Sequence, residues 1–114
     1  MSELLGIARF KFHEGKVEEF KRLSAQAMEI VRTKDSGTLQ YDIYLNDDES
    51  ECMVIERYRD SEALIEHAGH LGHLNEAIVA TGLVSGVLLG EPSAELRAKM
   101  ADSEVRLFTP YQSM

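Results

Sequence analysis

Cysteine occurs only once in this 114-residue chain, at Cys52, and tryptophan does not occur at all. A single cysteine excludes a disulfide bond within the chain and any zinc site built from several cysteines. An unpaired thiol is typical of proteins in a reducing compartment, so we expect a cytoplasmic protein. Cys52 has no histidine near it in the sequence, which predicts an inert buried thiol.

Basic residues are also scarce, since 12 lysines and arginines stand against 20 aspartates and glutamates. The resulting formal charge of −8 repels a phosphate backbone, and no basic cluster offsets it, so nucleic acid is not an expected partner. No apolar run is long enough to cross a bilayer, and the N-terminus lacks the pattern of a secretion signal. We therefore expect no membrane association.

The remaining composition is that of an ordinary globular protein, with 44% hydrophobic and 28% charged residues. A chain of this length buries roughly two-thirds of the surface that its unfolded form exposes, which is sufficient for one core. We therefore expect a single domain over residues 1–114. Glycine-rich phosphate loops and serine nucleophile motifs are missing, so the function has to come from individual side chains.

The first half of the chain alternates strand and helix signals. Residues 4–12 are rich in apolar and β-favouring side chains, which predicts a strand. Apolar residues then recur every three or four positions over 16–33, so this segment is expected to be an amphipathic helix that ends before Gly37. Residues 38–46 and 51–59 are strand-like and flank a polar loop, which predicts an antiparallel hairpin.

The second half begins with another helix, predicted over residues 60–80, in which Gly69 and Gly72 weaken the helix locally. Three short elements are predicted after it, namely a strand, a brief helix and a last strand, at residues 85–90, 94–101 and 104–109. The order is β-α-β-β-α-β with an insertion over 85–103. This order predicts an α+β protein with a ferredoxin-like antiparallel sheet.

Both faces of the predicted sheet carry apolar side chains. Tyr41 and Ile43 lie on one face of their strand while Tyr44 lies on the other, and Met53 opposes Val54 in the next strand. Two helices cover only one face of a four-stranded sheet, so the other face needs a different cover. A second copy of the chain is the simplest cover, which predicts a homodimer. The alternative is a monomer with scattered exposed apolar side chains.

Two stretches of the chain carry a family resemblance. They are residues 12–20, FHEGKVEEF, and residues 54–64, VIERYRDSEAL, the second of which is followed by Glu66 and His67. Together with the strand order they resemble the antibiotic biosynthesis monooxygenase (ABM) domain family, which includes quinol monooxygenases. The resemblance implies a dimeric α+β barrel. Some members degrade haem with an asparagine, a tryptophan and a histidine, and the missing tryptophan argues against that branch.

His67 is the most informative polar residue of the second predicted helix. At 100° per residue it falls near the middle of the apolar stripe, which is formed by Leu64, Leu71, Leu74 and Ile78. An imidazole there faces the sheet or a cavity beside it, where its surroundings tune its pKa near neutrality. With the family resemblance, His67 becomes our candidate for a catalytic base. The alternative is a core histidine with one hydrogen-bond partner.

His70 and His73 continue the same run, but they lie about 60° and 120° around the helix from His67. Ligands of a metal ion must converge, so this run does not predict a metal site. An ion shared by His67 and His70 with a carboxylate from elsewhere is an open alternative. His70 is otherwise counted among the substrate-binding candidates, whereas His73 is expected to be solvated.

Charged side chains also lie within the apolar strands, at Arg9, Glu56 and Arg57. A buried charge has to be paired or to serve a site, and an ion pair at a dimer interface is the plainer interpretation. Three tyrosines of the strands offer an aromatic surface and a hydroxyl to a ring-shaped substrate, although tyrosine is also an ordinary strand residue: Tyr41, Tyr44 and Tyr58.

The resemblance implies a monooxygenase that oxidises a small electron-rich aromatic compound, such as a quinol or polyphenol, with O₂ and without flavin, haem or metal. Such a reaction requires a base and a water-poor pocket, because the deprotonated substrate itself reduces O₂. His67 is the expected base, the tyrosines orient the ring, and Arg9 or Arg57 stabilises the developing oxyanion. The alternative function is a non-catalytic dimeric barrel that binds a small apolar ligand in stress response or regulation.

Overall fold

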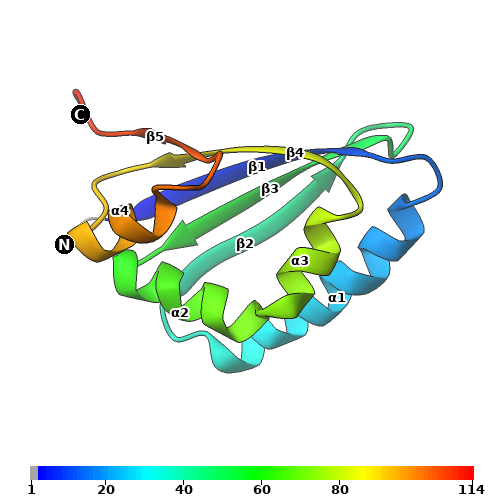
Figure 1. The fold of residues 1–114 in the computed structure, drawn as a ribbon, viewed down its shortest axis with the longest axis horizontal. Coiled ribbons are helices and arrows are strands. Elements are labelled where there is room, and N and C mark those ends of the chain that lie inside the picture. The colour runs from blue at the N-terminus through cyan, green and yellow to red at the C-terminus, as the bar shows by residue number, and fades with distance from the viewer. Residues whose placement is uncertain (1–2) are drawn as a thin grey trace.

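The computed structural model describes residues 3–114, and Figure 1 shows how their helices gather on one side of a sheet. In chain order the elements are β1 (Leu4–Phe12), α1 (Val17–Lys34), β2 (Thr38–Leu45), β3 (Glu51–Tyr58), α2 (Ser61–Leu71), α3 (His73–Val79), β4 (Gly82–Leu89), α4 (Ala94–Met100) and β5 (Arg106–Phe108). No helix within residues 3–114 has both the length and the hydropathy that a membrane span requires.

The sheet has the strand order β2-β3-β1-β4-β5. Its first four strands are antiparallel to one another, and α1 and the α2–α3 pair connect them in the predicted β-α-β-β-α-β order. The α+β class and the ferredoxin-like arrangement are thereby confirmed. The central position of β1 places the N-terminal strand between β3 and β4.

The C-terminal part differs from the prediction. The fourth strand of the ferredoxin-like unit is Gly82–Leu89, so the extra residues follow the unit instead of interrupting it before a strand over 104–109. β5 is a short additional strand that pairs in parallel with β4, which makes the sheet mixed and not wholly antiparallel. Glycines at Gly82 and Gly86 hide the strand signal of β4 because glycine is depleted in strands.

The single helix predicted over residues 60–80 is two helices, α2 and α3, that meet at Gly72. Gly72 has φ = 50° and ψ = −128°, a conformation that a residue without a Cβ adopts most easily. The start of α2 follows the prediction, since the Asp60 carboxylate accepts a hydrogen bond from the Ala63 N–H at 2.9 Å. Because of this break, α3 does not continue the axis of α2.

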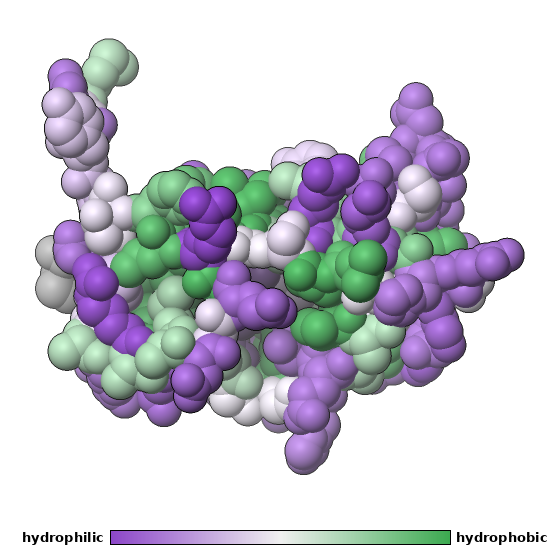
Figure 2. All heavy atoms as spheres, turned by 45° about the horizontal axis from the view of Figure 1, so that its top comes forward, coloured by the Kyte–Doolittle hydropathy of each residue, from purple (hydrophilic) through white to green (hydrophobic). Residues whose placement is uncertain are grey.

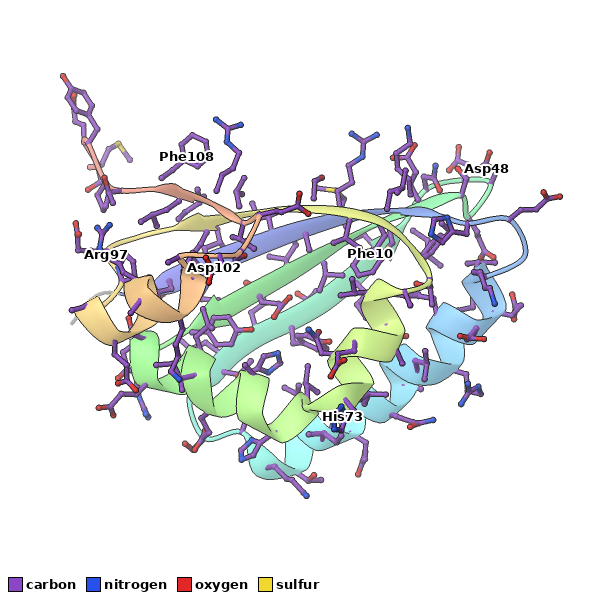
Figure 3. The ribbon with its side chains drawn as sticks, in the orientation of Figure 1. Phe10, Asp48, His73, Arg97, Asp102 and Phe108 are labelled. Atoms are coloured by element: carbon purple, nitrogen blue, oxygen red, sulfur yellow. The ribbon has the colours of Figure 1, made fainter. Side chains whose placement is uncertain are left out.

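Apolar side chains between the sheet and the helices form two buried clusters. The larger contains Phe10, which Figure 3 shows on the helix side of the sheet, and Cys52, whose thiol pKa is raised to about 11 by burial. The smaller joins Leu4 and Tyr58 to Leu96 of α4. The C-terminal helix therefore completes the core at the end of the sheet where β1 begins and β3 ends.

The opposite face of the sheet is apolar as well, as the strand alternation predicts. Figure 2 shows green apolar side chains on this face between purple charged ones. Tyr44 is 57% exposed, Met53 39% and Leu83 67%, and all three point away from the helices. No element of residues 3–114 packs over these three side chains as the helices pack over the other face.

The backbone around Gly82 leaves no room for a Cβ atom. A Cβ at this position would lie 2.5 Å from the carbonyl oxygen of Lys11 in the paired strand. Gly82→Ala should therefore lower the free energy of unfolding by about 1–3 kcal/mol, the usual cost of overpacking. Gly69→Ala is the matched control, because a Cβ there meets no neighbouring side chain and should add about 0.5–1 kcal/mol to helix stability. Urea unfolding measures both, and a Gly82→Ala protein as stable as the wild type contradicts the close packing.

Candidate functional site

His67 projects from α2 toward the sheet and is only 5% exposed. Each of its ring nitrogens has a carboxylate partner. Nδ1 lies 2.7 Å from Oδ2 of Asp35, which directly follows α1, and Nε2 lies 3.3 Å from Oε1 of Glu56 on β3. The imidazole thus joins the end of α1 and the sheet to α2.

Other side chains hold these two carboxylates in place. The Asp35 side chain is 1% exposed, accepts a hydrogen bond from Thr38 Oγ1 at 2.7 Å, and lies 2.6 Å from Nδ1 of His70. The Tyr58 hydroxyl donates a hydrogen bond to Oε1 of Glu56. Glu56 is therefore oriented by a tyrosine on its own strand and by the histidine above it.

The charges of this cluster favour the imidazolium form of His67. Burial opposes a charge on the ring, but the hydrogen bonds and charges of Glu56 and Asp35 outweigh burial and raise the pKa of His67. Burial also opposes the Asp35 anion, yet hydrogen bonds from two histidines and a threonine lower its pKa. Burial and the nearby charge of Glu56 raise the pKa of Tyr58, so its hydroxyl stays protonated and able to donate.

Two adjoining cavities lie between the sheet and the helices, with volumes of about 270 and 210 Å³. Glu56 and Asn75 line both cavities, whereas His67 lines neither. The space exists because small residues occupy three helix-facing positions of the central strands, at Gly6, Ala8 and Gly86. The carboxylate that meets the empty space is therefore that of Glu56, and His67 lies behind it.

The structure brings three of the predicted site residues together. Tyr58 lines the larger cavity and Tyr41 the smaller one. Their ring centroids lie 5.3 and 5.5 Å from that of His67, so the imidazole is packed between two aromatic rings. His70 does not reach the cavities and binds Asp35 instead.

Three other predicted residues lie on the far face of the sheet. Tyr44 is exposed there, Arg9 pairs with Glu51 at 2.8 Å, and Arg57 lies 3.4 Å from Glu3. Adjacent residues of a strand point to opposite faces, so these side chains cannot contact a ligand in the cavities of their own chain. Each arginine has a carboxylate partner within its own chain.

Sequence reasoning did not identify three residues as members of the site. Glu56 stood out only as a charge within a strand. It lies two residues from each of the buried Val54 and Tyr58 of β3, and this spacing indicates that it faces the helices. Asp35 is 32 residues from His67, and no sequence pattern connects the two. Asn75 lies beyond the break at Gly72, so a projection of one continuous helix gives its direction wrongly.

The family model of antibiotic biosynthesis monooxygenases matches residues 5–77, well over half of the chain. The chain belongs to the antibiotic biosynthesis monooxygenase family. The resemblance found in the sequence is thereby confirmed. The matched stretch includes the side chains around His67 and the polar residues that line the cavities: Asp35, Glu56, Tyr58, His67 and Asn75.

Solved structures share the fold of this ABM protein. MupZ from Pseudomonas fluorescens has a TM-score of 0.82 at 21% identity, and the match covers 98% of this chain and 88% of MupZ. Rv0793 from Mycobacterium tuberculosis has a TM-score of 0.69 at 25% identity, with 80% and 96% covered. A mutant of SnoaB, a cofactor-independent oxygenase from Streptomyces nogalater, has a TM-score of 0.65 at 19% identity, with 75% and 89% covered. No curated protein matches the chain.

His67→Gln is expected to destabilise the ABM domain by about 1.5–3 kcal/mol, because it removes the imidazolium from the buried Asp35 anion and leaves that anion only His70 and Thr38 as partners. The loss should be largest between pH 3.8 and 6.5, the ordinary values of the two groups. Because the pKa of His67 is raised in the folded protein, the stabilisation by the pair is lost as pH rises through the folded-state pKa of His67. Because the pKa of Asp35 is lowered, the same stabilisation is lost as pH falls through the folded-state pKa of Asp35. Urea unfolding of metal-free protein at pH values from below 3.8 to above 6.5 measures both losses.

The exposed His73 supplies the control for this experiment. His73→Gln should leave the free energy of unfolding within about 0.5 kcal/mol of the wild type, as is usual for surface substitutions. Equal stability of His67→Gln and wild-type protein at every pH would contradict a stabilising imidazolium between the two carboxylates.

Proposed function

We propose that this ABM protein is a cofactor-independent monooxygenase that oxidises a small electron-rich aromatic compound, with quinols or polyphenols as the substrate class. Family membership supports monooxygenase activity. One observation carries the finer proposal: the Glu56 carboxylate, held by Tyr58 and His67, faces a cavity whose walls are mainly apolar. A base in a water-poor cavity is what a substrate needs in order to become its own electron donor.

Glu56 is the proposed base. It takes a proton from a substrate hydroxyl, while His67 acts behind it as a positioning residue that fixes the carboxylate and balances its charge. Glu56 replaces His67 in the role of base because His67 lines neither cavity. Asn75, which lines both cavities, has an amide that can donate a hydrogen bond to the oxyanion of the substrate.

The proposed reaction needs no external reductant. A quinol and O₂ yield a hydroxylated quinone and water, and the quinol supplies all four electrons that reduce O₂. One oxygen atom forms a new C–O bond on the ring, and the other leaves as water with two hydrogens of the quinol. The proton held by Glu56 returns to the departing oxygen when the O–O bond of the peroxide intermediate breaks.

The size of the cavities favours a small substrate. A dry cavity of about 150 Å³ holds benzene in another protein, and typical ligand pockets start at about 300 Å³. The larger cavity here measures about 270 Å³, which suits a compound of one or two rings. Tyr58 and Leu88 form part of its walls, so an aromatic ring finds apolar contacts in this cavity.

Glu56→Gln is expected to lower kcat for a quinol by about 10²–10⁴-fold, because the amide keeps the size of the side chain but cannot take a proton. Oxygen uptake with a panel of quinols and polycyclic phenols, under air and under nitrogen, measures the rate. Glu29→Gln is the matched control, since Glu29 is an exposed residue of α1 whose side chain is 66% exposed. It should retain wild-type activity.

Two results would overturn parts of this proposal. Uptake that never exceeds the control without protein, while the same phenols bind, would replace catalysis with the ligand-binding alternative. A larger loss of kcat in His67→Gln than in Glu56→Gln would return the role of base to His67, even though the enzyme class stands.

We also propose that two copies of the chain associate through the face of the sheet that the helices leave uncovered. The exposed apolar residues Tyr44, Met53 and Leu83 on this face support the homodimer. Two of its cations have partners, Arg9 with Glu51 and Arg57 with Glu3, so burial leaves neither cation without a counter-charge. A cytoplasmic location remains part of the proposal and is supported by the unpaired thiol of Cys52.

Sedimentation equilibrium at micromolar concentration should give a mass of about twice the 12.8 kDa of one chain. Leu83→Lys should shift the equilibrium toward the monomer, because it replaces an exposed apolar side chain of the proposed interface with a charge. Tyr111→Lys should not, because Tyr111 is a 96% exposed residue of the C-terminal segment. A wild-type mass near 12.8 kDa would refute the dimer.

A further inference from the structure

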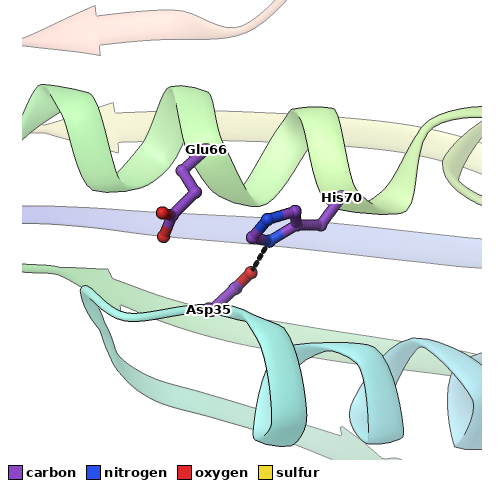
Figure 4. Close-up of side chains that lie close together, drawn as sticks. All are labelled: Asp35, Glu66 and His70. Carbon is purple, nitrogen blue, oxygen red and sulfur yellow. Dashed lines mark hydrogen bonds and ion pairs between the residues drawn. The ribbon is translucent and has the colours of Figure 1, made fainter.

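We propose that Asp35, Glu66 and His70 form a binding site for a divalent transition-metal ion, with Zn²⁺ as the ion that fits. Figure 4 shows Glu66 and His70 reaching down from α2 toward Asp35. One ligand atom from each residue lies within 4.8 Å of the other two. None of the three residues lines the cavities, so the inference does not rest on the proposed oxygenase function.

Helix geometry explains why the ligands converge. Glu66 and His70 are four residues apart in α2, so they project from one face of the helix on successive turns. Asp35 follows the last turn of α1 and faces this pair from the other side. The helical projection considered only the three histidines, which diverge around the helix. The ligands that meet at this point are one histidine and two carboxylates.

The surrounding contacts hold the potential ligands in position. Oδ2 of Asp35 is bound by His67 and Thr38, which leaves Oδ1 directed at Nδ1 of His70, 2.6 Å away. The Glu66 carboxylate accepts hydrogen bonds from the backbone N–H and the hydroxyl of Ser36, at 3.0 and 3.1 Å. Such supporting hydrogen bonds are what orient ligands around metal ions in proteins.

Electrostatics also favours a cation at this point. Two carboxylates lie close together here, and their mutual repulsion is relieved when a positive charge sits between them. A metal ion would take the place of the proton between Oδ1 of Asp35 and Nδ1 of His70. Ligands bound about 2.1 Å from one tetrahedral zinc ion lie about 3.4 Å apart, so small side-chain rotations are sufficient.

The donor set selects the class of metal. One imidazole nitrogen and two carboxylate oxygens suit Zn²⁺ or Co²⁺, whereas Mg²⁺ and Ca²⁺ prefer oxygen ligands alone. Three protein ligands leave the fourth tetrahedral position to water. The His70 side chain is 29% exposed, so an ion has access to the site from solvent. Binding would clamp the α1–β2 connection onto α2 through Asp35.

The test is a titration of untagged, metal-free protein with Zn²⁺ by calorimetry and with Co²⁺ by visible absorption. We expect one ion per chain, a tetrahedral Co²⁺ spectrum and a higher melting temperature with Zn²⁺. Glu66→Gln and His70→Gln should each weaken binding at least about tenfold, since even residues that only support a ligand have effects of that size.

The chain offers a matched control in the exposed pair His73 and Glu76, which also joins a histidine to a carboxylate but has no third ligand. His73→Gln should bind Zn²⁺ like the wild type. Absence of saturable binding, or unchanged affinity in Glu66→Gln and His70→Gln, would overturn the site. If those variants do not fold, NMR of wild-type protein with Co²⁺ decides: paramagnetic shifts centred on Ser36 and His70 support the site, and shifts centred on His13 or His73 refute it.

Discussion

His67 connects three segments that are far apart in the sequence, because its ring nitrogens bind Asp35 at the end of α1 and Glu56 on β3. All three side chains are wholly or largely withdrawn from water, so each charge depends on the others. The imidazolium connects α2 to the sheet at Glu56, the residue that lines both cavities. Removal of this contact would leave Asp35 with only His70 and Thr38 as partners, and Glu56 with only Tyr58.

The position of Glu56 follows from this contact and from the small residues around it. Gly6, Ala8 and Gly86 leave room beside β1 and β4, and Tyr58 and His67 direct the carboxylate into that room. The helix side of the sheet thus carries the ionisable group, while the far side carries paired arginines and exposed apolar residues. In this account, chemistry and association use opposite faces of one sheet.

The sequence predicted the fold better than the site, for physical reasons. Local periodicity identifies α1 and the first three strands, and it places His67 on the buried side of α2. The break at Gly72 and the glycine-rich β4 weaken that periodicity, so the helix was expected to continue and the last strand was misplaced. Asp35, one of the two partners of His67, is 32 residues away, and a contact at that separation depends on tertiary packing that no local pattern records.

We propose that a phenolic substrate binds between the sheet and the helices with its hydroxyl on Glu56. A crystal structure of the protein with a bound quinol, grown and frozen under nitrogen so that O₂ cannot consume the ligand, would show where the substrate lies. We expect a ring in the cavity of about 270 Å³ with a hydroxyl oxygen at hydrogen-bond distance from the Glu56 carboxylate. A ring bound on the far face of the sheet beside Arg9 or Arg57, with no ligand next to Glu56, would contradict it.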